Sequence, residues 1–234
     1  MANPKTQRMK HTLLFIWMLL VFCTGTAQDK KIVQELQGFS EVKGFDGLSI
    51  NLIKSDTNKA VVTGKNTNKV VMVNNDGVLK LRMKIDKIFS GYRTFIDLYY
   101  TEKLVVIDVN EDARITSEKS IKQDALELKA QEGGEIEISV EVEQLLIKAV
   151  TGGLINTSGS SDLQDVLINT GGIYKGKECN TKFSTVNVNA GSRAEIYALD
   201  YVKATVKAGG EVLVYGNPEK MEEKTIFGGT ITRM

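Results

Sequence analysis

Few side chains in this 234-residue chain could do acid–base or nucleophilic chemistry. Its only histidine, His11, lies in an N-terminal stretch with the features of a cleaved leader. The rest of the chain therefore has no imidazole for a Ser-His-Asp triad, a Cys-His pair or a histidine-ligated zinc site. Cys179 is the one cysteine beyond that stretch, and it follows polar residues. We interpret it as an unreactive thiol at the surface or at a strand edge.

Oxygen ligands are the remaining way to hold a metal ion. Asp108, Asn110 and Asp112 match the start of a calcium-binding loop. The match ends there, because Ala113 stands where such a loop needs glycine and Lys119 where it needs a bidentate glutamate. We interpret the segment as a solvated turn, and the sequence predicts neither a metal site nor a cofactor.

Paired carboxylates could hydrolyse a glycosidic bond if they faced each other across a groove, about 5–10 Å apart. Asp97 with Glu102, and Asp162 with Asp165, are candidate pairs. Neither pair recurs at a position that points to one face, and neither has a distinctive neighbour. The sequence therefore predicts no catalytic residue and no enzyme.

Aromatic side chains are better candidates for binding. Tyr92, Phe95, Tyr99 and Tyr100 lie within nine residues of one another, in a chain that is 7% aromatic. Exposed rings can stack on sugar faces or anchor a protein partner. Tyr92, Tyr99 and Tyr100 are our candidate binding residues. The alternative, which we favour for Phe95 and Tyr99, is that the rings fill an irregular part of the core.

A repeating framework must position these residues. A glycine pair, once replaced by glycine and serine, returns every 18 to 20 residues through the second half of the chain. The pairs are Gly133-Gly134, Gly152-Gly153, Gly171-Gly172, Gly191-Ser192, Gly209-Gly210 and Gly228-Gly229. A fixed period of about 20 residues is typical of a solenoid, in which each repeat buries its apolar side against the next.

Apolar residues alternate on both sides of each glycine pair. Ile147 and Ala149 precede Gly152, for example, and Ile155 follows it. This period-2 pattern indicates two short strands per repeat, with the glycines at the turn between them. The spine of a leucine-rich repeat is absent, and a β-sandwich would not keep so regular a spacing. The sequence therefore predicts an all-β fold, a single-stranded parallel β-helix (β-solenoid) with rungs of about 19 residues.

The first part of the fold is less regular. Asp76-Gly77 lies between two apolar runs and indicates a tight hairpin turn or a solenoid corner. We expect a single domain over residues 28–234, with irregular N-terminal rungs to about residue 110 and regular Gly-Gly rungs over about 124–234. Terminal repeats of solenoids are atypical because something must cover the open edge. Stacking of the regular rungs would also bring Asn169 and Asn189 together.

Residues 1–27 have the pattern of a secretory signal peptide. Basic residues precede an apolar run over residues 13–22, which is too short to span a membrane, and small residues lead to Ala27. Lipidation of Cys23 is the alternative, although Phe22 disfavours it. The remainder carries 27 basic and 29 acidic residues, a net charge of −2, so it has no basic footprint for nucleic acid. We expect an exported protein of the periplasm or the cell surface, with no transmembrane segment after cleavage.

The combination of features resembles a known family. A Phe-x-x-Leu-x-Ile strand at Phe45–Ile50 follows the leader, and serial rungs with Leu/Val-x-Ile/Val-x-x-Gly-Gly-x-Ile/Val come after it. Over residues 39–231 the chain is similar to the "putative auto-transporter adhesin, head GIN domain" family of Bacteroidetes. The resemblance implies a right-handed β-helix and an exported adhesin-like protein. It implies no catalytic or binding residues, and the chain has no translocating barrel of its own.

Three functions follow as expectations. The first is an exported, non-enzymatic, adhesin-like protein that presents a repetitive surface to a glycan or a surface protein. The second is a structural envelope protein that self-assembles into a homo-oligomer through its end rungs. The third is a polysaccharide-active β-helix enzyme.

Overall fold

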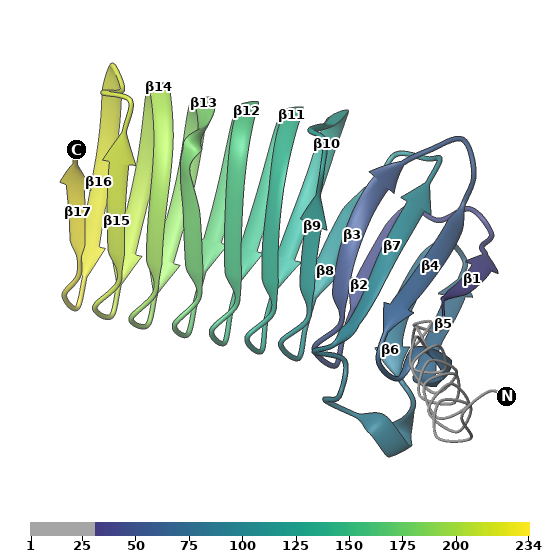
Figure 1. Cartoon of the computed structure of the whole chain (residues 1–234). Coiled ribbons are helices and arrows are strands. Elements are labelled where there is room, and N and C mark those ends of the chain that lie inside the picture. The colour runs from purple at the N-terminus through teal and green to yellow at the C-terminus, as the bar shows by residue number, and fades with distance from the viewer. Residues whose placement is uncertain (1–30) are drawn as a thin grey trace, which may run out of the picture.

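The computed structural model describes residues 31–234, which form the predicted β-solenoid of about 7 turns (Figure 1). Parallel strands stack side by side along its length. The regular part consists of β10 (Ile121–Ala130), β11 (Glu135–Ala149), β12 (Leu154–Ile168), β13 (Ile173–Asn189), β14 (Arg193–Lys207), β15 (Glu211–Tyr215), β16 (Lys220–Ile226) and β17 (Thr230–Arg233). Within residues 31–234, no helix is long and apolar enough to cross a lipid bilayer.

Each long strand bends over a corner and contributes to two sheets. In β11 the side chains of Ile136, Ile138 and Val140 point inward, and so do those of Leu145 and Ile147 beyond the corner. Two successive exposed residues at the corner reverse the phase of the alternation. We call the sheet that leads from a glycine turn to this corner the outgoing face, and the sheet that leads back the return face. The apolar core lies between the two faces.

The two glycines of a turn have different roles. Thr151 and Gly152 both have positive φ, 47° and 75°, which is the backbone of a type I′ turn. Gly153 has an ordinary φ, but a Cβ atom there would lie 2.1 Å from the carbonyl oxygen of Ala130 on the preceding rung. The first glycine therefore permits the turn, and the second lets adjacent rungs approach.

The turns are also hydrogen-bonded to one another along the solenoid. The N–H of Gly152 donates to the carbonyl of Thr170 at 3.2 Å, and the N–H of Gly133 donates to Thr151 at 3.3 Å. Stacking also confirms the expected side-chain contact, in which Nδ2 of Asn189 donates to Oδ1 of Asn169 at 2.7 Å. The row of turns is therefore a continuous ladder that fixes the spacing of the rungs.

Two further turns extend this ladder toward the N-terminus. Asp46-Gly47 and Glu111-Asp112 also have two consecutive positive φ values. The Gly47 N–H donates to the Glu111 carbonyl, and the Asp112 N–H to the Glu132 carbonyl. Only the end of the segment Asp108–Asp112, at Glu111 and Asp112, therefore forms the expected turn. Asp108 itself is buried in a strand, where it pairs with Lys43 at 3.3 Å.

The N-terminal rungs do not stack in sequence order. The rung of β2 (Glu41–Gly44) and β3 (Ser49–Lys54) lies between two rungs that follow it in the chain. On one side is the rung of β6 (Val78–Met83) and β7 (Thr94–Tyr100), and on the other that of β8 (Val106–Val109) and β9 (Arg114–Ser117). β2, β6 and β8 belong to the return face, and β3, β7 and β9 to the outgoing face.

Antiparallel strands cover the N-terminal end. β4 (Lys59–Gly64) pairs with β7, β1 (Ile32–Glu35) pairs with β4, and β5 (Val70–Asn75) forms a hairpin with β6. Asp76-Gly77 is the turn of that hairpin. Because these strands run against the direction of the rungs, they end the parallel stack and cover its edge.

A cluster of polar side chains is buried in the core at β13. The Tyr174 hydroxyl contacts Oγ1 of Thr157 at 2.8 Å and accepts a hydrogen bond from Nε2 of Gln164 at 2.7 Å. The ring crosses Gly176, where a Cβ would lie 2.4 Å from it, and the register between β12 and β13 shifts between Asn156 and Ser158. The bulge accounts for the longer sequence interval at this rung.

Cys179 lies in this same cluster, contrary to the expectation of a surface or edge thiol. It is fully buried, because the bulge turns its side chain toward the core. Burial raises the pKa of the Cys179 thiol to about 11. The thiol is therefore protonated and inaccessible in the folded protein.

The other end of the solenoid has charged side chains at core-facing positions. Glu223 is in register with Ala204, and Arg233 with Val214, both of which are buried. The two charged groups meet across the solenoid, with Nη2 of Arg233 3.6 Å from Oε1 of Glu223. The last rung thus places an ion pair where the preceding rungs place apolar residues.

Candidate functional site

The aromatic cluster divides between the two sides of β7. Ile96, Leu98 and Tyr100 point inward, and Tyr100 is 6% exposed, so its assignment as a surface binding residue is wrong. Phe95 and Tyr99 point outward, and Phe95 is 50% exposed, so the core alternative is wrong for Phe95. Ile96 and Leu98 determine which side of β7 faces inward, because they fill the core.

Phe95 borders a groove on the outgoing face. β7, β3 and β9 are neighbours there, which brings Phe95, Ser49 and Arg114 into one row and Asp97, Asn51 and Thr116 into the next. The groove has a volume of about 180 Å³, and the side chains of these two rows line it. Nδ2 of Asn51 donates to Oδ1 of Asp97 at 3.2 Å, which orients the amide and the carboxylate beside the ring.

A second groove continues the polar surface along the outgoing face. It has a volume of about 220 Å³ and crosses β9, β11, β12 and β13. Hydroxyl, amide and carboxylate groups line it, from Ser117, Glu137, Ser139, Asn156, Ser158 and Glu178. Arg114 joins the two grooves, because it lines the first and is hydrogen-bonded to Glu137 of the second.

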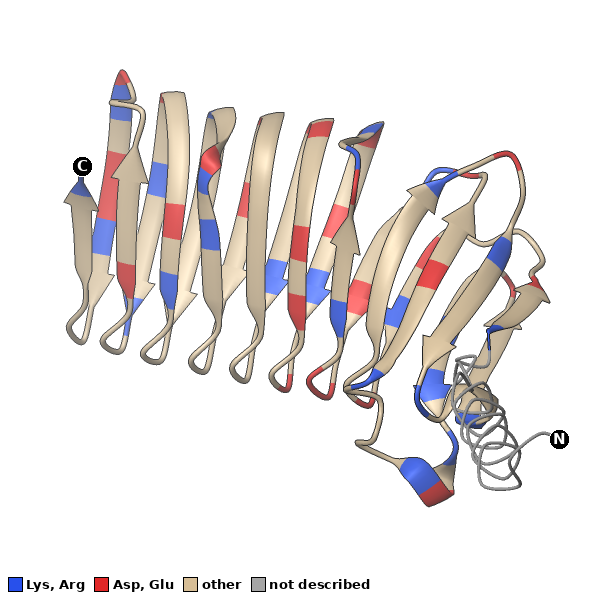
Figure 2. Ribbon diagram, in the orientation of Figure 1, with Lys and Arg blue, Asp and Glu red and all other residues tan. Residues whose placement is uncertain are grey.

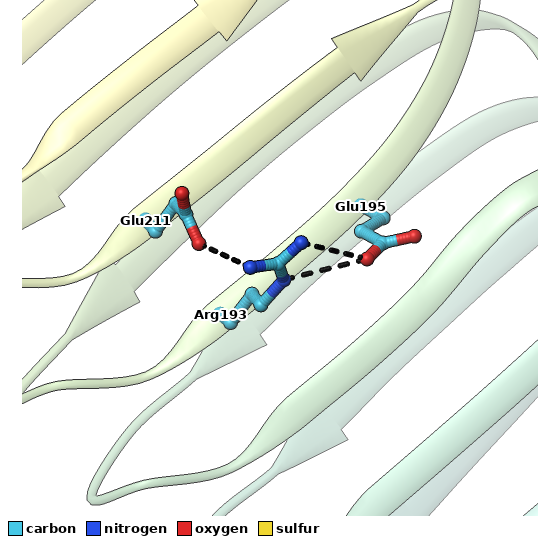
Figure 3. Close-up of polar contacts among 3 residues, drawn as sticks. All are labelled: Arg193, Glu195 and Glu211. Carbon is cyan, nitrogen blue, oxygen red and sulfur yellow. Dashed lines mark hydrogen bonds and ion pairs between the residues drawn. The ribbon is translucent and has the colours of Figure 1, made fainter.

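An arginine further along the same row forms a comparable pair of contacts. Arg193 lies between Glu195 and Glu211 (Figure 3), with Nη1 2.6 Å from Oε2 of Glu211 and Nη2 3.1 Å from Oε1 of Glu195. Glu211 is on the next rung, so the guanidinium connects neighbouring strands. The outgoing face is therefore a sheet of hydrogen-bonding groups whose charges are largely paired.

This arrangement has the groups that a binding site needs. A flat, half-exposed ring beside an amide, hydroxyls and a carboxylate can stack on a ligand and exchange hydrogen bonds with its hydroxyl groups. In each candidate catalytic pair, one acid is bonded to another side chain. Asp97 is bonded to Asn51, and Asp162 forms an ion pair with Lys182 at 2.7 Å. Within residues 31–234, no group of three or more acidic, cysteine or histidine side chains is placed to hold a metal ion.

Tyr92 lies outside these grooves, in the loop between β6 and β7. Its hydroxyl donates to Oδ2 of Asp112 at 2.9 Å, and this bond raises the pKa of Tyr92. The ring packs over Gly47 at the neighbouring turn. The hydroxyl of Tyr92 is therefore hydrogen-bonded to a residue of the row of turns, while more than half of Tyr92 stays exposed.

The turns beside this loop are acidic. Figure 2 shows acidic residues at the turns nearest the N-terminal rungs and none at the turns of the later rungs. Burial raises the pKa of Glu111, and the nearby carboxylates of Asp46 and Glu132 add to this effect. The polarity of the turn row thus changes along the solenoid, from acidic to uncharged.

Sequence reasoning missed most of the groove. Asn51, Arg114 and Thr116 come from strands separated from Phe95 by an irregular insertion, and no local motif marks them. The available signal was the pair of Asp-Gly and Glu-Asp turns at residues 46 and 111, which fall in line with the glycine ladder. Aligning those turns would have placed β3 beside β9, but it would not have placed β7.

Comparisons with known proteins agree with this architecture. A putative adhesin from Bacteroides fragilis NCTC 9343 has a similar structure, with a TM-score of 0.81 and 14% identity, covering 89% of this chain and 98% of that one. A putative adhesin from Parabacteroides distasonis ATCC 8503 has a TM-score of 0.70 and 17% identity, covering 90% of this chain and 98% of its own. A protein described as a putative lipid binding protein, from the same organism, has a TM-score of 0.68 with the same identity and coverage.

At these identities the structural likeness concerns the fold alone. No curated protein matches the chain. The family described as "Putative auto-transporter adhesin, head GIN domain" matches residues 38–218, which is most of the chain. This protein therefore belongs to the putative auto-transporter adhesin, head GIN domain family.

Proposed function

We propose that the protein is an exported, non-enzymatic binding protein that holds a glycan of the cell surface along its outgoing face. One observation carries the proposal: the half-exposed ring of Phe95 stands beside the hydrogen-bonded pair of Asn51 and Asp97. Sugar rings have an apolar face that stacks on aromatic rings and hydroxyls that pair with amides and carboxylates. Tyr99, on the same side of β7, extends the aromatic surface.

The solenoid favours an extended ligand over a small one. Neighbouring strands lie about 4.7–4.9 Å apart, so polar groups of adjacent rungs are repeated at that interval. The groove beside Phe95 and the groove lined by Ser139 and Asn156 belong to the same sheet, with Arg114 between them. A chain of sugar units lying across the strands could contact both grooves together.

The adhesin names of the family and of the structural neighbours support a binding role over an enzymatic one. The chemistry of the grooves supports it too, because Glu137 is bonded to Arg114 and Asp97 to Asn51. The signal-like leader lies outside the described residues, and it is the reason for proposing export to the periplasm or the cell surface. Lipidation of Cys23 likewise concerns that segment.

Self-assembly through the end rungs is the weaker alternative. Stacking a second copy on the last rung would bury Glu223 and Arg233, whose ion pair faces the core. Removing charged groups from water costs free energy that their mutual attraction often fails to offset. A second copy of the chain therefore finds an ion pair on this rung and not an apolar docking site.

A glycan array probed with the purified protein tests the proposal. We expect saturable binding to a class of oligosaccharides that is weakened by Phe95→Ala. Phe183→Ala is the matched control, because Phe183 is 43% exposed and lies at the corner, outside both grooves. Light scattering of the same samples gives the oligomeric state. A defined oligomer that binds no glycan would instead support the structural alternative.

A further inference from the structure

The loop between β6 and β7 exposes more apolar surface than any function assigned above uses. We call residues 84–93 the tip loop. It contains the 3₁₀ helix Ile85–Lys87 and projects beyond the row of turns (Figure 1). Ile85 is 82% exposed, Phe89 55% and Ile88 41%. Three large apolar side chains on one short convex segment form a patch of the kind that marks interaction sites.

The structure holds this loop in place instead of letting it fold onto the core. Both carboxylate oxygens of the buried Asp46 accept backbone hydrogen bonds, from the N–H of Met83 at 2.9 Å and from that of Phe89 at 3.2 Å. The Gly91 N–H donates to the Asp46 carbonyl at 2.9 Å. Phe89 itself has φ of 56°, an unfavourable conformation for a bulky residue. Such strain persists only where surrounding contacts impose it, and it often marks functional segments.

Basic side chains surround the apolar residues. The loop exposes three basic side chains, those of Lys84, Lys87 and Arg93. Lys65 is also exposed, and it lies beside the loop because its N–H donates to the Arg93 carbonyl. The single acid of the loop, Asp86, forms an ion pair with Lys69 at 2.6 Å.

Acidic groups also lie beside the loop, in the turn row. Asp112 is bonded to the Tyr92 hydroxyl, and Glu111 and Glu132 are near each other in the same row of turns. Tyr92 is thus the boundary between the acidic turns and the basic tip.

We propose that the tip loop docks on an anionic lipid bilayer, with Ile85, Ile88 and Phe89 in the headgroup layer and Lys84 and Lys87 against the phosphates. The patch is convex, so it needs a partner that deforms around it. Aliphatic side chains flanked by lysines are the composition of segments that lie in a membrane interface. A glycan would gain little here, because Ile85 and Ile88 have neither a ring nor a polar group.

This proposal is independent of glycan binding, because the grooves and the tip loop share no residue. A protein with both surfaces would lie against a membrane by its tip and present its outgoing face to a polysaccharide. Salt would weaken the membrane contact, since the attraction of lysines to anionic lipids is screened.

Vesicle co-sedimentation of the full chain tests the proposal. The vesicles are phosphatidylcholine alone, or phosphatidylcholine mixed with phosphatidylglycerol. We expect binding to the mixed vesicles only. Ile85→Ser combined with Phe89→Ser should reduce partitioning at least tenfold, because both side chains are transferred from water. Lys84→Glu combined with Lys87→Glu should reduce it at least about fivefold for each lysine, because each loses an attraction to anionic lipid.

Matched controls separate the tip from the general surface. Leu163→Ser with Phe183→Ser removes exposed apolar groups from the corner, and Lys148→Glu with Lys207→Glu makes the same change of charge elsewhere. Both should bind vesicles like the unchanged protein, as should Phe95→Ala. All the replaced side chains are exposed, so we expect thermal unfolding to be little changed. Absence of binding to the mixed vesicles, or equal binding by the tip variants and their controls, would overturn the proposal.

Discussion

The backbone N–H of Phe89 donates a hydrogen bond to Oδ1 of Asp46, a buried carboxylate 43 residues earlier in the chain. This contact ties the tip loop to the turn of the β2–β3 rung. Oδ2 of the same side chain accepts the N–H of Met83, at the end of β6. One carboxylate therefore fixes both the start of the loop and the strained residue within it.

Replacing this carboxylate should loosen the loop. Asp46→Asn keeps a side chain that tolerates the positive φ but turns one of the two acceptors into a donor. We expect a loss of about 1–3 kcal/mol in the free energy of unfolding, the typical cost of leaving a buried polar group unpaired. Hydrogen exchange should speed up at the amides of residues 83–91.

Asp76→Asn is the matched control, because Asp76 has a similar φ of 50° but is exposed in a hairpin turn. It should change neither the stability nor the exchange rates of the tip loop. Equal effects of the two substitutions would show that the Asp46 carboxylate does not hold the loop.

The two glycines of one turn should respond differently to alanine. Gly152→Ala places a Cβ in open space and only strains a residue with φ of 75°, so we expect a cost of about 1–2 kcal/mol. Gly153→Ala places a Cβ 2.1 Å from the Ala130 carbonyl oxygen, so the rungs must separate or the strand must shift. We expect a larger loss, about 2–3 kcal/mol or more.

Urea denaturation of the two variants measures this difference. The rung at Gly191-Ser192 shows that a Cβ can be accommodated at the second position, because Ser192 is buried there. Its hydroxyl has no hydrogen-bond partner among residues 31–234. If Gly153→Ala were as stable as Gly152→Ala, the close approach of rungs would not be the reason for the second glycine.

The repeat was readable from the sequence because turn and core requirements recur at a fixed interval. Each turn needs positive φ, and each flank needs alternating apolar residues, so local rules agree with the stacking. The N-terminal order was not readable in this way. The β2–β3 rung pairs with strands about 40 to 65 positions later, and nothing near Ser49 or Asn51 specifies which segments become its neighbours.

The assignments of Tyr100 and Cys179 failed for different reasons. Side chains of β7 alternate between the core and the surface. Tyr100 points inward because it lies on the same side of the strand as Ile96 and Leu98, which fill the core, whereas Phe95 lies on the other side. Cys179 points inward because of the bulge around Gly176, where the ring of Tyr174 crosses the strand. The polar neighbours of Cys179 gave a misleading signal, because they do not show that a bulge changes the alternation before it.

The buried thiol should make the protein less stable in alkali. Burial raises the pKa of Cys179 from an ordinary 9.0 to about 11, and burial also raises the pKa of Tyr174. The folded state thus keeps protons that the unfolded chain releases. Stability should be complete below pH 9 and fall between pH 9 and 11 by up to about 1.4 kcal/mol per pH unit because of Cys179. Tyr174 should add a similar fall only above its ordinary pKa of 10.0.

Denaturant titrations at pH 7 and pH 10 measure this dependence. Cys179→Ala should reduce the difference between the two pH values, because only Tyr174 then contributes. A thiol reagent at pH 8 should label Cys179 only after denaturant is added. Rapid labelling of the folded protein would contradict its burial.

The ion pair at the last rung should keep copies of the chain apart. Glu223→Leu combined with Arg233→Leu would convert two core-facing charged positions into apolar ones on an open strand edge. Exposed apolar edges promote pairing between molecules. We expect the mass from light scattering to rise with protein concentration for the double variant and not for the unchanged protein.

Lys148→Leu combined with Glu141→Leu is the control, since it adds apolar surface on the sides of the solenoid, away from its end. Association by both double variants would attribute the effect to hydrophobicity in general. No association by Glu223→Leu with Arg233→Leu would show that the ion pair does not protect the edge.

The most direct test of glycan binding is calorimetric titration of the strongest oligosaccharide from the array into three proteins: unchanged, Phe95→Ala and Phe183→Ala. Loss of a stacking ring should weaken binding at least tenfold in Phe95→Ala, which corresponds to about 1.4 kcal/mol. Phe183→Ala should bind like the unchanged protein, because its ring is at the corner, outside both grooves. Equal affinities for all three proteins would contradict the assignment of the outgoing face as the glycan-binding surface.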